Sequence, residues 1–322
     1  MLGRRSFVGL LLASLCLPAR GQEGGAFPVT VSHAFGETVI PARPQRILTI
    51  GWMAQDAVLA LGEVPAAMPL QSWGGNADGV LPWVADALAA RGLPLPQLLS
   101  FDDGPPIEQI AALGPDLILA PFSDMTEGQY RLLSALAPTI PPAERAWSGS
   151  WQAVTLQVGA ALGRPQEAQK LVEGVGQHLA QTAAAHPSFA GKSFTFGYYQ
   201  PSTSAVGVYV ASDPRVQLLT DLGLVLSSGA AALPNDRGFY VDVSLELLES
   251  VDADVFITWH SSQAELDQFR ANPLVQLFAP VRDGRHVGLV DQSFVMATSA
   301  PSVLSIPWAL DRLVPELAAV LG

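Results

Sequence analysis

One pattern occurs twice in this 322-residue chain and limits what the chain can fold into. Residues 105–121 read PPIEQIAALGPDLILAP, and residues 243–259 read VSLELLESVDADVFITW. In each copy a glutamate, Glu108 or Glu246, opens a short acidic helical stretch, and an aspartate eight residues later leads into an apolar run. A helix followed by a buried strand is the repeating unit of an α/β layer. Two copies that lie far apart in the chain indicate two similar lobes.

The elements around each copy follow a matching order. Helical patterns alternate with short apolar runs, and we expect helices over residues 53–62, 79–92, 107–113 and 126–138, then over 213–223, 264–271 and 302–321. A helix before a strand with a leading aspartate is common in α/β proteins, so each copy taken alone is also consistent with an ordinary, unrepeated unit. The matching order on both sides favours the repeat.

A helical segment interrupts the alternation between the two copies. Residues 164–187 read RPQEAQKLVEGVGQHLAQTAAAHP, with Pro165 suited to a first helical turn and Pro187 to a stop. About 22 residues at 1.5 Å each give a rod of about 33 Å. The fold class that we predict is α/β, with two similar Rossmann-like lobes with parallel-sheet cores, residues 27–163 and 188–322, joined by one long rigid interlobe helix over 164–187.

The N-terminus, MLGRRSFVGLLLASLCLPARG, has the features of an export signal peptide over residues 1–21. Arg4 and Arg5 precede an apolar run too short to span a bilayer, and the Arg-Arg-Ser-Phe-Val order fits a twin-arginine signal. Small residues place cleavage near Gly21. The single cysteine, Cys16, follows the bulky Leu15, so we favour cleavage over a membrane lipid anchor at Cys16. We therefore expect a periplasmic protein.

Charge and motifs exclude several functions. The net charge of −12 becomes −15 when residues 1–21 are removed, because three arginines and no acid leave with them, and such a chain is a poor nucleic-acid binder. No Gly-x-Ser-x-Gly elbow or Walker motif occurs, and the five histidines are scattered without ligand spacing. We therefore expect no metal site and no catalytic residues, although a secreted enzyme that uses an interlobe cleft remains the alternative of another class.

Aromatic side chains follow the predicted strands, where the carboxyl ends of α/β strands face a ligand crevice. Such side chains can bind a large, partly apolar ligand, whereas core packing is the alternative for any single one. Tyr198 and Tyr199 end one predicted strand, and Phe294 and Met296 follow another. The candidate ligand-binding residues are Trp52, Trp73, Tyr199, Tyr209, Arg215, Trp259, His260 and Phe294.

Four segments resemble the periplasmic substrate-binding proteins of ABC importers for ferric siderophores and cobalamin. They are HAFGETVIPARPQRILTIG, IEQIAALGPDLILA, VSLELLESVDADVFIT, and the ending NPLVQLFAPVRDGRHVGLV followed by SIPWALDRLVP. The resemblance implies two lobes, a long connecting helix, little hinge movement and one ligand between the lobes. It also implies that an acidic residue on each lobe, here Glu108 and Glu246, docks on arginines of the permease dimer.

The resemblance leaves the ligand open. It implies a monomer that delivers an iron–siderophore complex to the importer, without a covalent cofactor, and the alternative is a cobalamin- or haem-binding importer component. Relatives of the hydroxamate and citrate type often place arginine in the cleft, but here Trp73 is followed by GGNADG. Arg145, Arg215 and Arg237 remain as arginines for this role.

Overall fold

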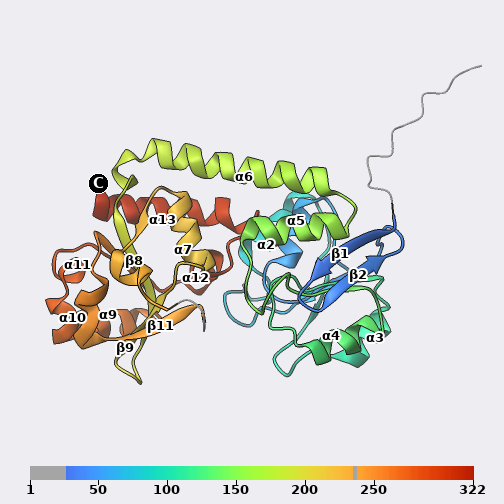
Figure 1. Cartoon of the computed structure of the whole chain (residues 1–322), viewed down its shortest axis with the longest axis horizontal. Helices are drawn as coiled ribbons and strands as arrows, with labels where there is room; N and C mark the ends of the chain where they lie inside the picture. The colour runs from blue at the N-terminus through green and yellow to red at the C-terminus, as the bar shows by residue number, and fades with distance from the viewer. Residues whose placement is uncertain (1–26, 235–237) are drawn as a thin grey trace, which may run out of the picture.

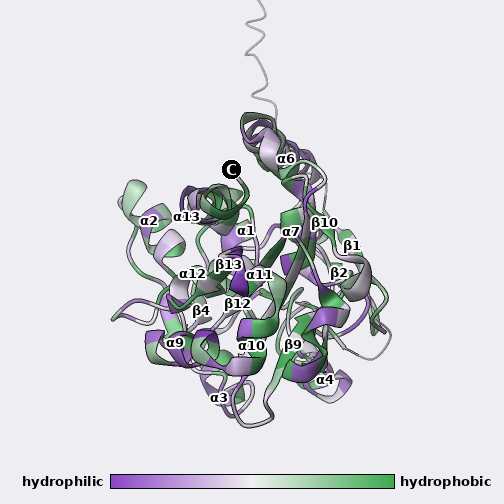
Figure 2. Cartoon of the chain, turned by 90° about the vertical axis from the view of Figure 1, so that its left-hand side faces the viewer, coloured by the Kyte–Doolittle hydropathy of each residue, from purple (hydrophilic) through white to green (hydrophobic). Residues whose placement is uncertain are grey.

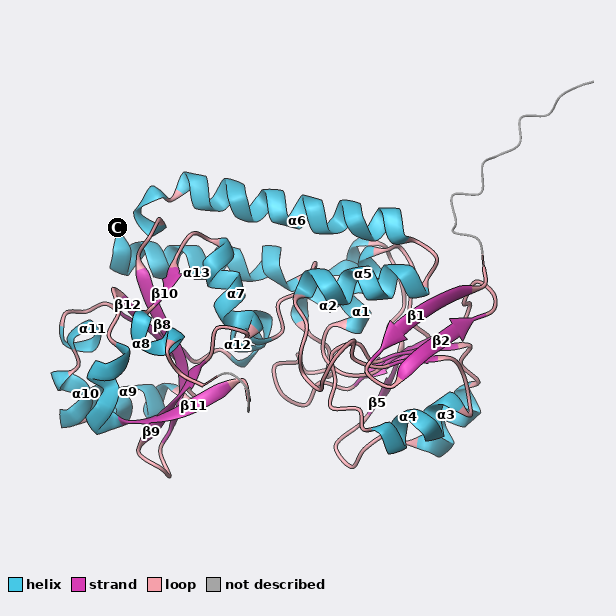
Figure 3. Ribbon diagram, in the orientation of Figure 1, coloured by secondary structure: helices cyan, strands magenta, loops and turns pink. Residues whose placement is uncertain are grey.

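The computed structural model describes residues 27–234 and 238–322, which form two α/β halves joined by a long helix (Figure 1). The predicted signal peptide, with Arg4, Arg5 and Cys16, lies outside the described residues, as does Arg237. The α/β class is confirmed. Each half has its own sheet, and helices cover the sheets (Figure 3).

The N-terminal half contains a hairpin and a five-stranded sheet in which every pairing is parallel. The hairpin is β1 (Val29–His33) with β2 (Gly36–Ile40), and the sheet has the order β5-β4-β3-β6-β7. Its strands are β3 (Ile47–Thr49), β4 (Ala67–Pro69), β5 (Gln97–Leu99), β6 (Leu117–Leu119) and β7 (Thr139–Ile140). Its helices are α1 (Ala54–Ala60), α2 (Pro82–Ala90), α3 (Ile107–Leu113), α4 (Glu127–Ser134) and α5 (Trp151–Ala161).

The C-terminal half has a mixed sheet of order β11-β9-β8-β12-β13, with β10 also paired to β8. Its strands are β8 (Ser193–Gln200), β9 (Ala205–Tyr209), β10 (Val225–Leu226), β11 (Tyr240–Ser244), β12 (Val255–Trp259) and β13 (His286–Leu289). Its helices are α7 (Pro214–Asp221), α8 (Ser228–Ala231), α9 (Gln263–Ala271), α10 (Pro273–Leu277), α11 (Ala279–Arg282), α12 (Gln292–Ser299) and α13 (Ser305–Leu321), with 3-10 turns η1 (Pro187–Phe189) and η2 (Leu245–Val251).

The expectation of a parallel-sheet core in both lobes is confirmed, but the C-terminal sheet adds an antiparallel edge. Strands β8, β10, β12 and β13 are parallel, but β9 runs antiparallel to β8 and β11 runs antiparallel to β9. Only residues 201–204 connect β8 to β9, and a parallel neighbour needs a crossover of a dozen or more residues. The short connection therefore enforces a hairpin at this edge.

Helix α6 (Pro165–Ala185) is the predicted interlobe helix, and its presence is confirmed. Its 21 residues give a length of about 31 Å, and it runs along one side of both halves (Figure 1). It packs on α5 of the N-terminal half and on α7 and α13 of the C-terminal half.

Hydropathy colouring shows the contrast between the buried strand β9, in green, and the exposed face of α9, with purple residues (Figure 2).

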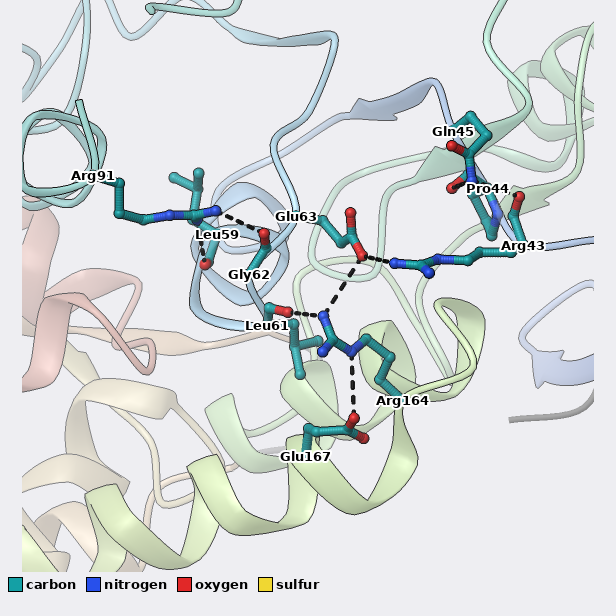
Figure 4. A network of polar contacts seen from close by, with 10 residues as sticks. All are labelled: Arg43, Pro44, Gln45, Leu59, Leu61, Gly62, Glu63, Arg91, Arg164 and Glu167. Atoms are coloured by element: carbon teal, nitrogen blue, oxygen red, sulfur yellow. Dashed lines mark hydrogen bonds and ion pairs between the residues drawn. The ribbon is translucent and has the colours of Figure 1, made fainter. Parts of the chain in front are cut away.

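The start of α6 is fixed to the N-terminal half by a polar network (Figure 4). The guanidinium of Arg164 donates to the carbonyl of Leu61, lies 3.5 Å from Glu63 and 3.4 Å from Glu167. Arg43 also pairs with Glu63, at 2.7 Å. These contacts join the first turn of α6 to the end of α1, and they fix the position of that turn on the N-terminal half.

The repeated pattern has a structural reason in its aspartates. Asp116 precedes β6 and accepts from the backbone N–H groups of Gln45 and Arg46 at 2.7 and 2.8 Å, just before the neighbouring strand β3. Asp254 precedes β12 and accepts from the backbone N–H and the hydroxyl of Ser193, the first residue of β8, at 2.8 and 2.9 Å. Each aspartate therefore fixes the start of the adjacent parallel strand.

We predict that Asp116→Ala lowers the free energy of unfolding by about 1–2 kcal/mol, because two backbone donors at the entry to β3 lose their acceptor. Chemical denaturation of the purified protein measures this change. Asp86→Ala, on the exposed face of α2, is the matched control and should stay within about 0.5 kcal/mol of the parent. Equal stability of the two variants would contradict the role given to Asp116.

Candidate functional site

A cavity of about 560 Å³ lies at the carboxyl edge of the N-terminal sheet. Residues from the loops after all five parallel strands line it, and α12 of the other half contributes Met296. The strand order reverses between β3 and β6, because the chain continues from β3 to β4 on one side of the sheet and from β6 to β7 on the other. Ligands of open α/β sheets bind at such a point, which makes this cavity the candidate functional site.

The loop after β3 lies directly against the loop after β6. Gly51 has φ +86°, and a Cβ atom there would lie 2.2 Å from the carbonyl oxygen of Phe122, so this close approach requires glycine. The backbone N–H of Trp52 then donates to the same carbonyl at 3.2 Å. This contact fixes the backbone from which Trp52 reaches the cavity wall.

Two tryptophans from different loops meet in that wall. The rings of Trp52 and Trp147 lie 4.6 Å apart between centroids, and both are near Phe122, at 6.4 and 5.7 Å. Trp147 has φ +53°, a strained conformation for a large side chain, and its N–H donates to the carbonyl of Ser123 at 3.0 Å. Trp147 is not among the residues predicted from the sequence, although it follows the last strand of this half.

A second aromatic group connects the two halves. Trp73, which is 37% exposed, lies 5.8 Å from Trp259 of the C-terminal half. Trp259 stacks on Tyr198 at 5.4 Å, and its indole N–H donates to the hydroxyl of Tyr209 at 2.7 Å. The structure therefore brings the predicted residues Trp73, Trp259 and Tyr209 together, and adds Tyr198.

Arg215 packs against the Tyr209 ring of this aromatic group. Its guanidinium lies 4.2 Å from the ring centre of Tyr209, 2.9 Å from Asp213 and 3.1 Å from the hydroxyl of Ser299. The residue is only 9% exposed. Burial raises the pKa of Tyr209, so its hydroxyl stays protonated at neutral pH. The contacts of Arg215 are thus made within the protein, and they position Tyr209.

Three other predicted residues lie elsewhere. Tyr199 points to the opposite face of the C-terminal sheet from Tyr198, where it contacts His260 and Phe269 with ring centroids 5.9 and 4.8 Å apart. Phe294 is buried beneath the guanidinium of Arg312, at 4.5 Å. Its neighbour on α12, Met296, lines the cavity instead. We therefore leave Tyr199, His260 and Phe294 out of the proposed site.

The surroundings of His260 are those of a packed core. Its Nε2 atom lies 2.7 Å from the hydroxyl of Thr258, which also lies 2.7 Å from Nε2 of His286. Burial lowers the pKa of His260 to about 4 and that of His286 to about 3. Both imidazoles are therefore neutral at physiological pH.

Carboxylates occupy part of the cavity wall. Asp102 and Asp103 follow β5, and Asp124 follows β6, and all three are exposed. Within the described part of the chain, the cavity lining contains no lysine or arginine. None of these acids was predicted from the sequence, although Asp124 stands in the loop after the apolar run of β6.

Two polar contacts hold the halves together beside the cavity. The hydroxyl of Ser293 on α12 donates to the carbonyl of Gly74 at 2.8 Å. The buried carboxyl of Asp56 on α1 accepts from the indole of Trp83 at 2.8 Å and from the hydroxyl of Ser302, in the loop before α13. Burial raises the pKa of Asp56 to about 7, against the opposing effect of these hydrogen bonds.

The apolar core also continues from one half to the other. Trp83 of α2 lies 5.4 Å from Trp308 of α13, and buried residues of both halves form one hydrophobic cluster. Helix α13 therefore covers part of the N-terminal half although it follows the C-terminal sheet in sequence.

Residues 27–234 and 238–322 contain no group of three or more His, Cys, Asp or Glu side chains able to hold a metal ion. None of the helices in these two ranges is long and apolar enough to cross a bilayer.

The sequence matches a family model described as periplasmic binding protein over residues 74–292. Among curated proteins, the Fe(3+) dicitrate-binding periplasmic protein FecB of Escherichia coli K12 is 24% identical over 291 residues, 89% of each chain.

Solved structures share the fold. PiaA of Streptococcus pneumoniae TIGR4, in complex with ferrichrome, superposes with a TM-score of 0.84 at 28% identity and covers 91% of this chain and 98% of its own. A periplasmic solute binding protein of Mycobacterium smegmatis gives a TM-score of 0.77 at 34% identity, with 91% and 99% covered.

Proposed function

This chain belongs to the periplasmic binding protein family, and from that premise we propose that it captures a ferric siderophore between its two halves and delivers it to an ABC importer. The observation that carries this proposal is the aromatic wall of the cavity, built from Trp52, Trp73 and Trp147 at the carboxyl ends of parallel strands. A volume of about 560 Å³ lies within the range of small-molecule sites. PiaA in complex with ferrichrome and the Fe(3+) dicitrate-binding protein FecB support an iron chelate as the ligand.

Iron would enter this site as cargo inside its chelator. The described residues offer no cluster of metal ligands, so the protein would contact the outer surface of the chelate rather than the ion. Indole rings suit that task because they present a large apolar area with little conformational freedom to lose. The proposed ligand-binding residues are Trp52, Trp73, Trp147, Trp259 and Met296, with Tyr209 and Arg215 positioning Trp259.

We propose that residues 1–21 direct export by the twin-arginine route and are removed near Gly21, which leaves a periplasmic monomer without a covalent cofactor or enzymatic activity. Glu108 and Glu246 are both exposed, outside the cavity and one on each half, as docking residues for a permease dimer would be.

We expect ferrichrome, or another ferric chelate of a hydroxamate, catecholate and carboxylate panel, to quench the tryptophan fluorescence saturably with a Kd below about 1 µM. Trp52→Leu and Trp147→Leu should each weaken binding about ten-fold or more, because each removes part of a stacked wall worth about 1–3 kcal/mol. Trp308→Leu, outside the cavity lining, is the matched control and should keep the parent Kd. Absence of saturable quenching across the panel would reject the siderophore function.

A further inference from the structure

We propose that the cavity selects ferric chelates of zero or positive net charge, the hydroxamate class, and rejects the anionic catecholate and carboxylate chelates. This inference rests on the proposed function and concerns the same site. It starts from the three carboxylates of Asp102, Asp103 and Asp124, which share the cavity wall with Trp52, Trp73 and Trp147.

The carboxylates are not neutralised by the described residues around them. Asp102 accepts from the hydroxyl of Ser100 at 2.9 Å, a neutral donor. None of the ion pairs in the described ranges involves Asp102, Asp103 or Asp124. The wall therefore presents up to three negative charges to whatever fills the cavity.

Arg215 of the C-terminal half does not offset the negative charge of the cavity wall. The guanidinium of Arg215 already pairs with Asp213 at 2.9 Å and lies beneath the ring of Tyr209. Its relative exposure of 9% leaves little of it for a ligand. An anionic chelate would thus meet carboxylates on one side without a free arginine among the described residues of the cavity lining.

The tryptophans, like the carboxylates, favour a positively charged ligand. The face of an indole ring is the negative end of its quadrupole and attracts cations. A chelate held between the halves would also displace water, so its charge would interact with the wall at a lower effective dielectric than in solution. Aromatic rings beside carboxylates therefore favour a ligand with a pendant ammonium group over one with a pendant carboxylate.

A set of three ferric chelates with one core tests the charge alone. Ferrioxamine B carries a pendant ammonium group, its N-acetyl derivative is neutral at that position, and its N-succinyl derivative carries a carboxylate there. We expect affinity to fall in that order, by about ten-fold for each unit of charge, as measured by tryptophan quenching at low salt. The preference should shrink as ionic strength rises.

The protein variant Asp102→Asn/Asp103→Asn/Asp124→Asn should bind the three derivatives within about three-fold of one another. The control variant Asp86→Asn/Asp267→Asn/Asp311→Asn changes the net charge equally at exposed positions outside the cavity, and should keep the full ranking. A control that lost the ranking would show that net charge, and not the cavity wall, sets the preference, and would overturn the inference.

The ligand series on the unmodified protein separates the two levels of the proposal. Equal affinity for the three derivatives, or tightest binding of the succinylated form or of ferric dicitrate, would overturn the charge inference and leave the siderophore function standing. If no ferric chelate in the set binds, the proposed function fails and the charge inference fails with it.

Discussion

Changing Glu108 and Glu246 together to alanine is expected to lower ligand-stimulated ATPase activity of the reconstituted permease at least about ten-fold, with each single variant less affected. Both glutamates are exposed and stand in the first turn of a helix, Glu108 in α3 and Glu246 in η2. Exposed charges add only about 0–1 kcal/mol to the stability of a folded chain, but across an interface they direct encounter and register. One contact on each half would fix both position and rotation on a two-fold partner.

The glutamates have a purely local alternative role, because a negative charge in a first helical turn is favoured by the helix dipole. That role predicts a change of a few tenths of a kcal/mol in stability and no effect on transport. Parallel measurements of Tm, ligand Kd and ATPase stimulation separate the two roles. Asp86→Ala/Asp267→Ala, with one exposed acid on each half, is the control of equal charge. Lost ligand affinity with normal ATPase stimulation would place Glu108 and Glu246 at the ligand instead.

The second large effect that we expect is a pH-dependent stability that depends on Asp56. Its folded pKa is raised to about 7 by burial, whereas an unfolded aspartate titrates near 3.8. Below about pH 4 both states hold the proton, and the stabilising contribution is fully present. As pH rises toward and through 7, the unfolded chain releases the proton freely while the folded state must ionise a buried carboxyl, so the contribution is lost.

The expected size of that loss is about 4 kcal/mol between pH 4 and pH 8, since each pKa unit corresponds to about 1.36 kcal/mol. Asp56→Asn keeps an oxygen that can accept from Trp83 and Ser302 but cannot ionise, so the variant should gain stability relative to the parent over this range. Denaturant titrations at several pH values measure the difference, with Asp86→Asn as the exposed control. Parallel stability curves for Asp56→Asn and the parent would contradict the assignment.

The α/β class and helix α6 could be predicted because both follow from periodicity over many residues. The choice between Tyr198 and Tyr199 could not. Both end strand β8, and successive side chains of a strand point to opposite faces. Helices cover both faces of this sheet, so Tyr198 and Tyr199 both meet apolar neighbours and the pattern does not identify the face nearer to the ligand.

Residues missed at the cavity were missed for different physical reasons. Trp147 lies seven residues beyond the two-residue strand β7, and it has a left-handed backbone where its ring meets that of Trp52, which spacing does not indicate. Strand β5 has only three residues, the first of them exposed, and gives no clear apolar run, so the acids that follow it were not placed at a strand end. Arg215 was predicted as a ligand-binding residue, but its ion pair with Asp213 and its contact with the ring of Tyr209 could not be read from spacing.

The packing of α13 on the N-terminal half has a consequence for synthesis of the chain. Trp308 and Ser302, the partners of Trp83 and Asp56, are synthesised much later than these residues, about 225 residues later in the case of Trp83. At about 5–20 residues per second, the apolar side of α2 stays uncovered for roughly 10–45 s. During that interval the nascent N-terminal half exposes an apolar surface, which is covered once α13 has been synthesised.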